Sequence, residues 1–283
     1  MKILYILFFS ISFATAYSQQ TGFEDQVSIL SKEQKDSVRK EINKAIDVSD
    51  LYVSTHYKFE SNLEIVYLIS LLDHHFNLGK TMVDESRIME SRGNNNYVLH
   101  LYGKLAGVLP EASVIEQHLD VLKRKNFDDY VNNEVTISVW SEYAGKYPMP
   151  YNALESMKKF YDTNPLMQAK GLLAFKNLSL YQNDTAVISK VAYFKTKVSE
   201  NLNKSVENLD VKDGWAYRVV SIAAYLYATE DKKIPILGWT KELKQYLKNG
   251  YGVMSGNEFA EPDPYTNIYG LWALLELKNR TDY

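Results

Sequence analysis

The chain lacks cysteine, is poor in glycine and proline, and carries no excess of basic charge. Its 283 residues include no Cys, 13 Gly and 7 Pro, and the formal net charge at pH 7 is -3. The absence of cysteine excludes disulfides, thiolate nucleophiles, and zinc or iron–sulfur sites that use cysteine ligands. The absence of a basic excess leaves nothing to neutralise phosphates, so a nucleic-acid partner is not expected.

Long hydrophobic runs are also scarce, and the one that is present stands at the N-terminus. Lys2 precedes an apolar run over residues 3–16, and small residues occupy the -3 and -1 positions of a cleavage site after Ser18. This layout is typical of a secretory signal peptide. The run has about 14 residues, fewer than the roughly 20 that span a bilayer. We expect residues 1–18 to be cleaved, no membrane span, and a secreted or periplasmic mature protein.

The rest of the chain shows apolar residues at three- and four-residue spacing, which predicts helices. Charged, amphipathic segments alternate with more apolar ones, and the latter are expected to be buried on most sides. The charged helices are predicted at 32–47, 113–125, 150–161, 187–203 and 240–248. The apolar helices are predicted at 63–72, capped by Ser61 or Asn62, and at 133–147, 165–181, 214–228 and 264–277. Residues 78–109 receive no assignment.

Each charged helix and the apolar helix after it form one predicted hairpin, with a repeat of about 35 to 50 residues. No Ser/Gly-rich linker interrupts the series, so residues 19–283 are expected to form a single domain. Antiparallel hairpins with one inner and one outer helix can close into an α/α toroid, remain an incomplete ring, or stack as a solenoid. The predicted fold is therefore all-α, a toroid or incomplete ring, with an α-solenoid as the alternative.

The last hairpin carries a family-like pattern: a glycine-aromatic-glycine turn, an acidic-proline step, and an apolar helix opened by Tyr-Thr. The residues are Gly250, Tyr251, Gly252, Asp263, Tyr265, Thr266, Trp272, Ala273, Leu274 and Leu277. This pattern resembles the repeat of the terpene cyclase and protein prenyltransferase superfamily, which implies an α/α toroid. The likeness covers about 65 C-terminal residues. The prenyltransferases' cysteine-bound zinc and the cyclases' DxDD motif have no counterpart here, so the resemblance implies a scaffold, and no cofactor is expected.

Two hairpin starts near the C-terminus supply the most site-like group of side chains. The predicted ligand-binding residues are Asp213, Trp215, Tyr217, Arg218, Asp263 and Tyr265. In a toroid, the N-terminal ends of the inner helices share one rim, which would bring this set together. Aromatic faces beside a carboxylate and a guanidinium can stack on and hydrogen-bond a sugar or a small amphiphile. A capped helix start with a packed tryptophan is the alternative interpretation.

Asp73-His74-His75 is the densest group of potential metal-binding or catalytic residues. Adjacent helical residues point about 100° apart, so the two histidines do not share a face as an i, i+4 pair does. The group ends an apolar helix, where histidines can simply bind the last carbonyls. No metal site is predicted.

The composition and this candidate site favour recognition. Tyrosine, with 22 copies, offers an apolar body and a polar tip that suit the walls of a sugar or lipid cleft. We expect a secreted scaffold that binds a carbohydrate, an amphiphile or an envelope protein through an aromatic-lined concave face, without turnover. The alternative is a carbohydrate-active or isoprenoid- or lipid-active lyase or hydrolase on the same scaffold, so the sequence leaves catalysis open.

Overall fold

The computed structural model of the chain is helical in every segment that it describes, and no β-strand occurs there. The described residues are 30–56, 63–76, 154–155, 157–204, 214–230, 234–246 and 264–281. The predicted helices at 113–125 and 133–147 and the unassigned residues 78–109 lie outside these ranges, and the predicted helix at 150–161 lies only partly inside them. The all-α prediction is confirmed for the described residues.

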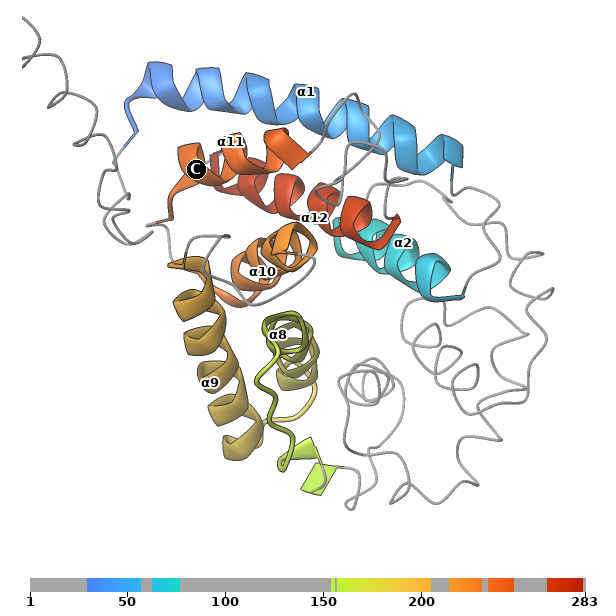
Figure 1. Cartoon of the computed structure of the whole chain (residues 1–283), viewed down its shortest axis with the longest axis vertical. Helices are drawn as coiled ribbons and strands as arrows, with labels where there is room; N and C mark the ends of the chain where they lie inside the picture. Colours follow the sequence, from blue (N-terminus) through green and yellow to red (C-terminus); the bar gives the residue numbers. More distant parts are fainter. Residues whose placement is uncertain are drawn as a thin grey trace, which may run out of the picture.

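The helices form two layers (Figure 1). They are α1 (Lys32–His56), α2 (Leu63–Phe76), α8 (Pro165–Ser179), α9 (Thr185–Leu202), α10 (Gly214–Ala228), α11 (Ile236–Tyr246) and α12 (Pro264–Thr281). Helix α9 packs on α8 and α10, and α11 packs on α10, α12 and α1. In Figure 1, α9, α11 and α1 follow one edge, and α8, α10, α12 and α2 lie beside them.

Burial separates the two layers as the hydrophobic pattern predicts. Every residue of 217–226 in α10 and of 267–277 in α12 is buried, so these inner helices are covered on all sides. Helix α9 instead buries Val187, Lys190, Phe194, Val198, Asn201 and Leu202, which recur at three- or four-residue spacing along one face. The alternation of an apolar inner helix with a charged outer helix is confirmed for α8 to α12.

The spatial order of the inner helices differs from their order in the chain. Helix α8 packs on α10, α10 on α12, and α12 on α2, so a helix near the N-terminus follows the last helix of the chain. Helix α1 packs on α12 as well. Arg39 of α1 donates a hydrogen bond to the Thr281 carbonyl, which places the start of α1 beside the end of α12. The two termini of the helical series therefore meet.

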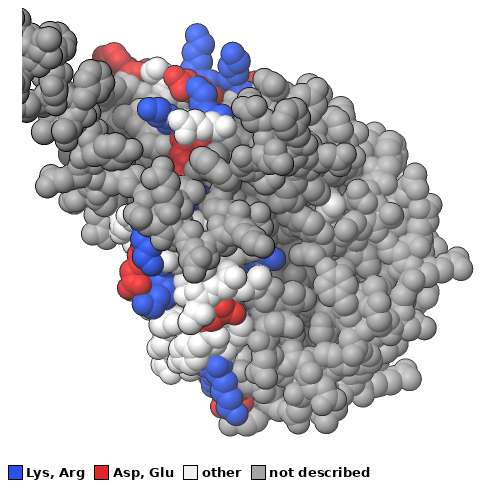
Figure 2. Space-filling model, in the orientation of Figure 1, with Lys and Arg blue, Asp and Glu red and all other residues white. Residues whose placement is uncertain are grey.

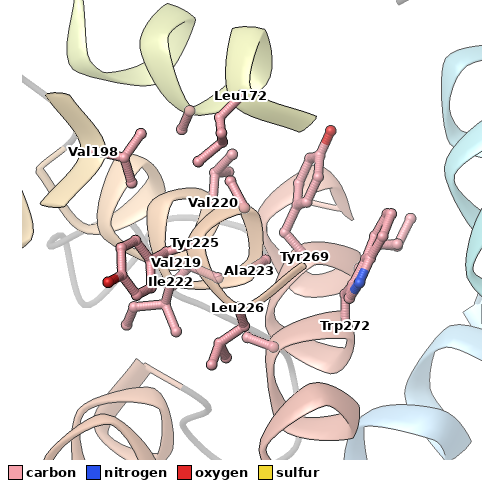
Figure 3. Close-up of a cluster of buried hydrophobic side chains, with 14 of the residues drawn as sticks. Leu172, Val198, Val219, Val220, Ile222, Ala223, Tyr225, Leu226, Tyr269 and Trp272 are labelled. Carbon is pink, nitrogen blue, oxygen red and sulfur yellow. The ribbon is translucent and has the colours of Figure 1, made fainter. Parts of the chain in front are cut away.

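A continuous hydrophobic core joins the layers, and α10 runs through its middle (Figure 3). Val198 of α9 and Tyr225 lie on one side of α10, and Tyr269 and Trp272 of α12 lie on the other. Tyr225 meets the outer-layer Trp239 edge to face, with ring centroids 5.9 Å apart. Tyr269 and Trp272 thus occupy the face of the inner layer that points away from α9.

Two helix starts follow directly from their capping residues. The Asn164 side chain accepts hydrogen bonds from the amides of Leu166 and Met167, and Pro165 occupies the first helical position. The predicted start of this helix is confirmed, and its end lies two residues before the predicted Tyr181. Asp184 caps α9 in the same way, so that helix starts at Thr185, two residues earlier than predicted.

Four further predicted boundaries are wrong, at both ends of α11 and at the ends of α12 and α1. Helix α11 starts at Ile236 and not at Thr240, since Pro235 opens its first turn and its carbonyl accepts from the Trp239 amide. It also ends at Tyr246, two residues before the predicted end. Helix α12 continues four residues beyond the predicted end, and Arg280 in this added turn donates to the Leu226 and Thr229 carbonyls of the α10 end. Helix α1 continues nine residues beyond the predicted end, to His56.

The stabilisation that Asp184 gives to α9 should depend on pH. The hydrogen bond from Lys158, with further ones from the Ala186 and Val187 amides, holds the pKa of Asp184 below its ordinary value. A carboxyl with a lower pKa in the folded state stabilises the protein above its unfolded pKa and loses this contribution as the pH falls through the folded value.

Asp184→Asn keeps a capping oxygen but does not titrate, so it isolates this effect. The stability advantage of the wild type over this variant should be constant above about pH 5 and should shrink below about pH 4. Urea unfolding across this pH range measures the difference. An advantage that is the same at all pH values would contradict the prediction.

The surface of the described residues carries both charge signs. Figure 2 shows Lys and Arg side by side with Asp and Glu on the described part of one face. One such pair bridges the outer layer, where Lys244 of α11 lies 2.8 Å from Glu41 of α1. None of the described helices has the length and apolar character that would let it cross a membrane.

Candidate functional site

Of the six residues in the predicted ligand-binding set, the side chains of Tyr217 and Arg218 are described. Asp213 and Asp263 lie outside the described residues. Trp215 and Tyr265 lie within α10 and α12, but their side chains are not described. The convergence of the two helix starts on one rim stays a prediction.

Tyr217 and Arg218 direct their polar atoms to neighbouring helices. Arg218 Nε and Nη2 lie 2.6 and 2.8 Å from the two carboxylate oxygens of Glu242 in α11. Arg218 Nη1 donates to the carbonyls of Leu202 and Lys204 at 2.8 and 3.2 Å, and thereby caps the end of α9. Tyr217 donates from its hydroxyl to the Asn201 carbonyl at 3.3 Å. These contacts use the polar atoms of Tyr217 and Arg218 at the end of α9, whereas the alternative interpretation, a capped helix start with a packed Trp215, stays a prediction.

Burial reinforces the structural role of this pair. Tyr217 is 1% exposed and Arg218 is 8% exposed, so neither presents much surface to a ligand. Burial raises the pKa of the Tyr217 hydroxyl, and the nearby Arg218 opposes this shift. The hydroxyl therefore stays protonated and remains a hydrogen-bond donor to the α9 end.

A second group of side chains gathers at the other end of the inner helices, about 14 Å along α10 from Arg218 at 1.5 Å per residue. It consists of His75 and Phe76 of α2, Tyr227 of α10, Tyr269, Trp272 and Glu276 of α12, and Asn177 of α8. We call it the inner-face cluster. Four helices from both ends of the chain contribute to it.

Aromatic rings enclose the His75 imidazole. Its centroid lies 4.6 Å from Phe76, 5.0 Å from Tyr227 and 5.4 Å from Trp272. The first two contacts are edge to face, the arrangement that aromatic pairs favour. Tyr269, which is buried, stacks on Trp272 with ring centroids 6.4 Å apart and nearly parallel planes. The imidazole is thus held in a fixed position with aromatic walls on several sides.

One buried carboxylate organises the polar atoms of the cluster. Glu276, 9% exposed, places Oε1 at 3.1 Å from His75 Nε2 and accepts a hydrogen bond from Trp272 Nε1 at 3.3 Å. Trp272 and Glu276 lie one helical turn apart on α12, so the same face of that helix supplies the ring and the acid. At the opposite side, the Tyr227 hydroxyl lies 3.5 Å from Asn177 Oδ1.

The cluster is partly open to solvent. The His75 side chain is 33% exposed, and Phe76, Tyr227 and Asn177 are half-buried. Trp272 is 2% exposed and forms the floor. The accessible part of the cluster is therefore the His75 imidazole with parts of Phe76 and Tyr227, and such rings can stack on another ring.

Sequence reasoning found the histidines but missed this cluster. His75 Nε2 does not bind the terminal carbonyls of its own helix; it lies instead against a carboxylate 201 residues away. The pairing has no local signature, although the predicted burial of the helix over 264–277 marks a glutamate there as unusual. Among the described residues, no group of three or more His, Asp or Glu is placed to hold a metal ion.

A buried lysine in the outer layer has a structural role. Lys190 Nζ donates to the Phe160 carbonyl at 2.6 Å and lies 3.0 Å from the centroid of the Tyr161 ring. Burial lowers the pKa of Lys190, and the interaction with Tyr161 opposes that shift. These contacts fasten the segment before α8 onto α9, away from the inner-face cluster.

Comparison of the chain with protein-family models, with curated proteins and with solved structures finds no match. The resemblance of the C-terminal hairpin to the terpene cyclase and protein prenyltransferase superfamily therefore stays an expectation.

Proposed function

We propose that this protein is a secreted helical scaffold that binds a small ring-bearing ligand at the inner-face cluster, without turnover. The observation that carries the proposal is the partly exposed surface formed by His75 and Tyr227, which come from two helices and pack on the buried Trp272 of a third. A buried carboxylate fixes the histidine from behind. Such a pre-formed aromatic surface with a few placed polar groups is typical of ligand sites.

The packing of α1 and α2 on α12 supports an α/α toroid as the scaffold. In a closed ring the first and last hairpins are neighbours, whereas in a solenoid they are the two most distant units. The contacts of α12 with α1 and α2 agree with closure. The inner-face cluster would then lie on the concave side, because Tyr269 and Trp272 point away from the outer α9 (Figure 3).

The second candidate function is a proton-transfer enzyme acting on a carbohydrate or lipid. Its support is the hydrogen-bonded pair of His75 and Glu276 beside the Tyr227 hydroxyl, since a histidine oriented by a carboxylate is a common general base. The described residues place no activated nucleophile beside this pair, and binding alone accounts for the aromatic enclosure. We therefore give recognition the first place.

The binding proposal predicts that ligand affinity depends on Tyr227 and His75. The purified protein would be screened by thermal shift with soluble oligosaccharides and with amphiphiles below their critical micelle concentrations. The affinity of each compound that binds would then be measured by calorimetry. Tyr227→Ala and His75→Ala should each weaken binding at least tenfold, which corresponds to about 1.4 kcal/mol. The loss of a stacking face or of a fixed hydrogen-bonding edge is the physical reason.

Tyr181→Ala is the matched control, because Tyr181 is 48% exposed at the turn between α8 and α9 and lies outside the cluster. Its affinity should equal that of the wild type. Equal affinity of all three variants would show that binding takes place elsewhere. Release of a chemically altered product from any hit would favour the enzyme alternative.

A further inference from the structure

We draw no further inference here: the strongest candidate, the surface patch of Leu180, Tyr181 and Ile188 around the turn between α8 and α9, is exposed and apolar, but nothing in the structure shows what covers it.

Discussion

Replacement of Arg218 by alanine should lower the free energy of unfolding by about 4 kcal/mol. The change leaves the Glu242 carboxylate, whose side chain is 17% exposed, without the two-pronged partner that now lies within 2.8 Å. It also removes the donor to the Leu202 and Lys204 carbonyls at the end of α9. A partly buried charge and two helix-end carbonyls lose their partner in a single step, and this places the effect well above that of an exposed ion pair.

Urea unfolding of Arg218→Ala, Glu242→Ala and the double variant measures the effect. The double variant should be more stable than the sum of the single losses predicts, because it no longer contains a carboxylate or a guanidinium that has lost the other. Arg218→Lys should restore less than half of the loss, since an ammonium cannot form the paired contact. Lys197→Ala, which breaks an exposed pair with Glu200, is the control and should cost less than about 0.5 kcal/mol.

The same experiment bears on the predicted ligand-binding set around Arg218. If Arg218→Ala proves as stable as the wild type, the guanidinium is not needed by the fold and is available for a ligand at the rim. A loss near the expected size, with unchanged ligand affinity of the folded variant, would instead establish Arg218 as the connection between α9, α10 and α11.

Local physics was sufficient to predict most of the described helices. The span of α10 matches its prediction at both ends, because the residues after Gly214 are almost wholly apolar. The start of α8 follows from an asparagine and a proline, both local signals. The end of α12 was underestimated, since Arg39 donates to its Thr281 carbonyl and Arg280 within it donates to the Leu226 carbonyl, both far away in the sequence. Such contacts leave no trace in hydrophobic periodicity.

The candidate site could be predicted only in part, for a related reason. The residue types are visible in the sequence, and His75 stands in a group that the sequence singles out. What the sequence lacks is the register between α2 and α12, which decides that His75 meets Glu276 and not a neighbour one turn away. Register between helices so distant in the chain depends on the packing of the whole inner layer, and no motif encodes it.

The proposed closure of the helices into a ring gives the last prediction. Ile42→Ala should lower the free energy of unfolding by about 3 kcal/mol, because Ile42 is fully buried on α1 and its truncation leaves a cavity beside α12 and α11. In a solenoid, an end helix opens locally, and its opening destabilises the adjacent repeat alone. In a closed ring, α1 joins the first hairpin to the last, so weakening it should destabilise the C-terminal hairpin as well.

Native-state hydrogen exchange distinguishes the two architectures, because it reports opening free energies helix by helix. In Ile42→Ala, protection should fall by a similar amount in α1, α10 and α12, and the unfolding transition should remain single. Val48→Ala is the matched control, since Val48 lies on the same helix but is 38% exposed, and it should change protection by less than about 0.5 kcal/mol. Loss of protection confined to α1 would favour the solenoid. It would also show that the packing of α2 on α12, and with it the position of His75 over Glu276, does not depend on α1.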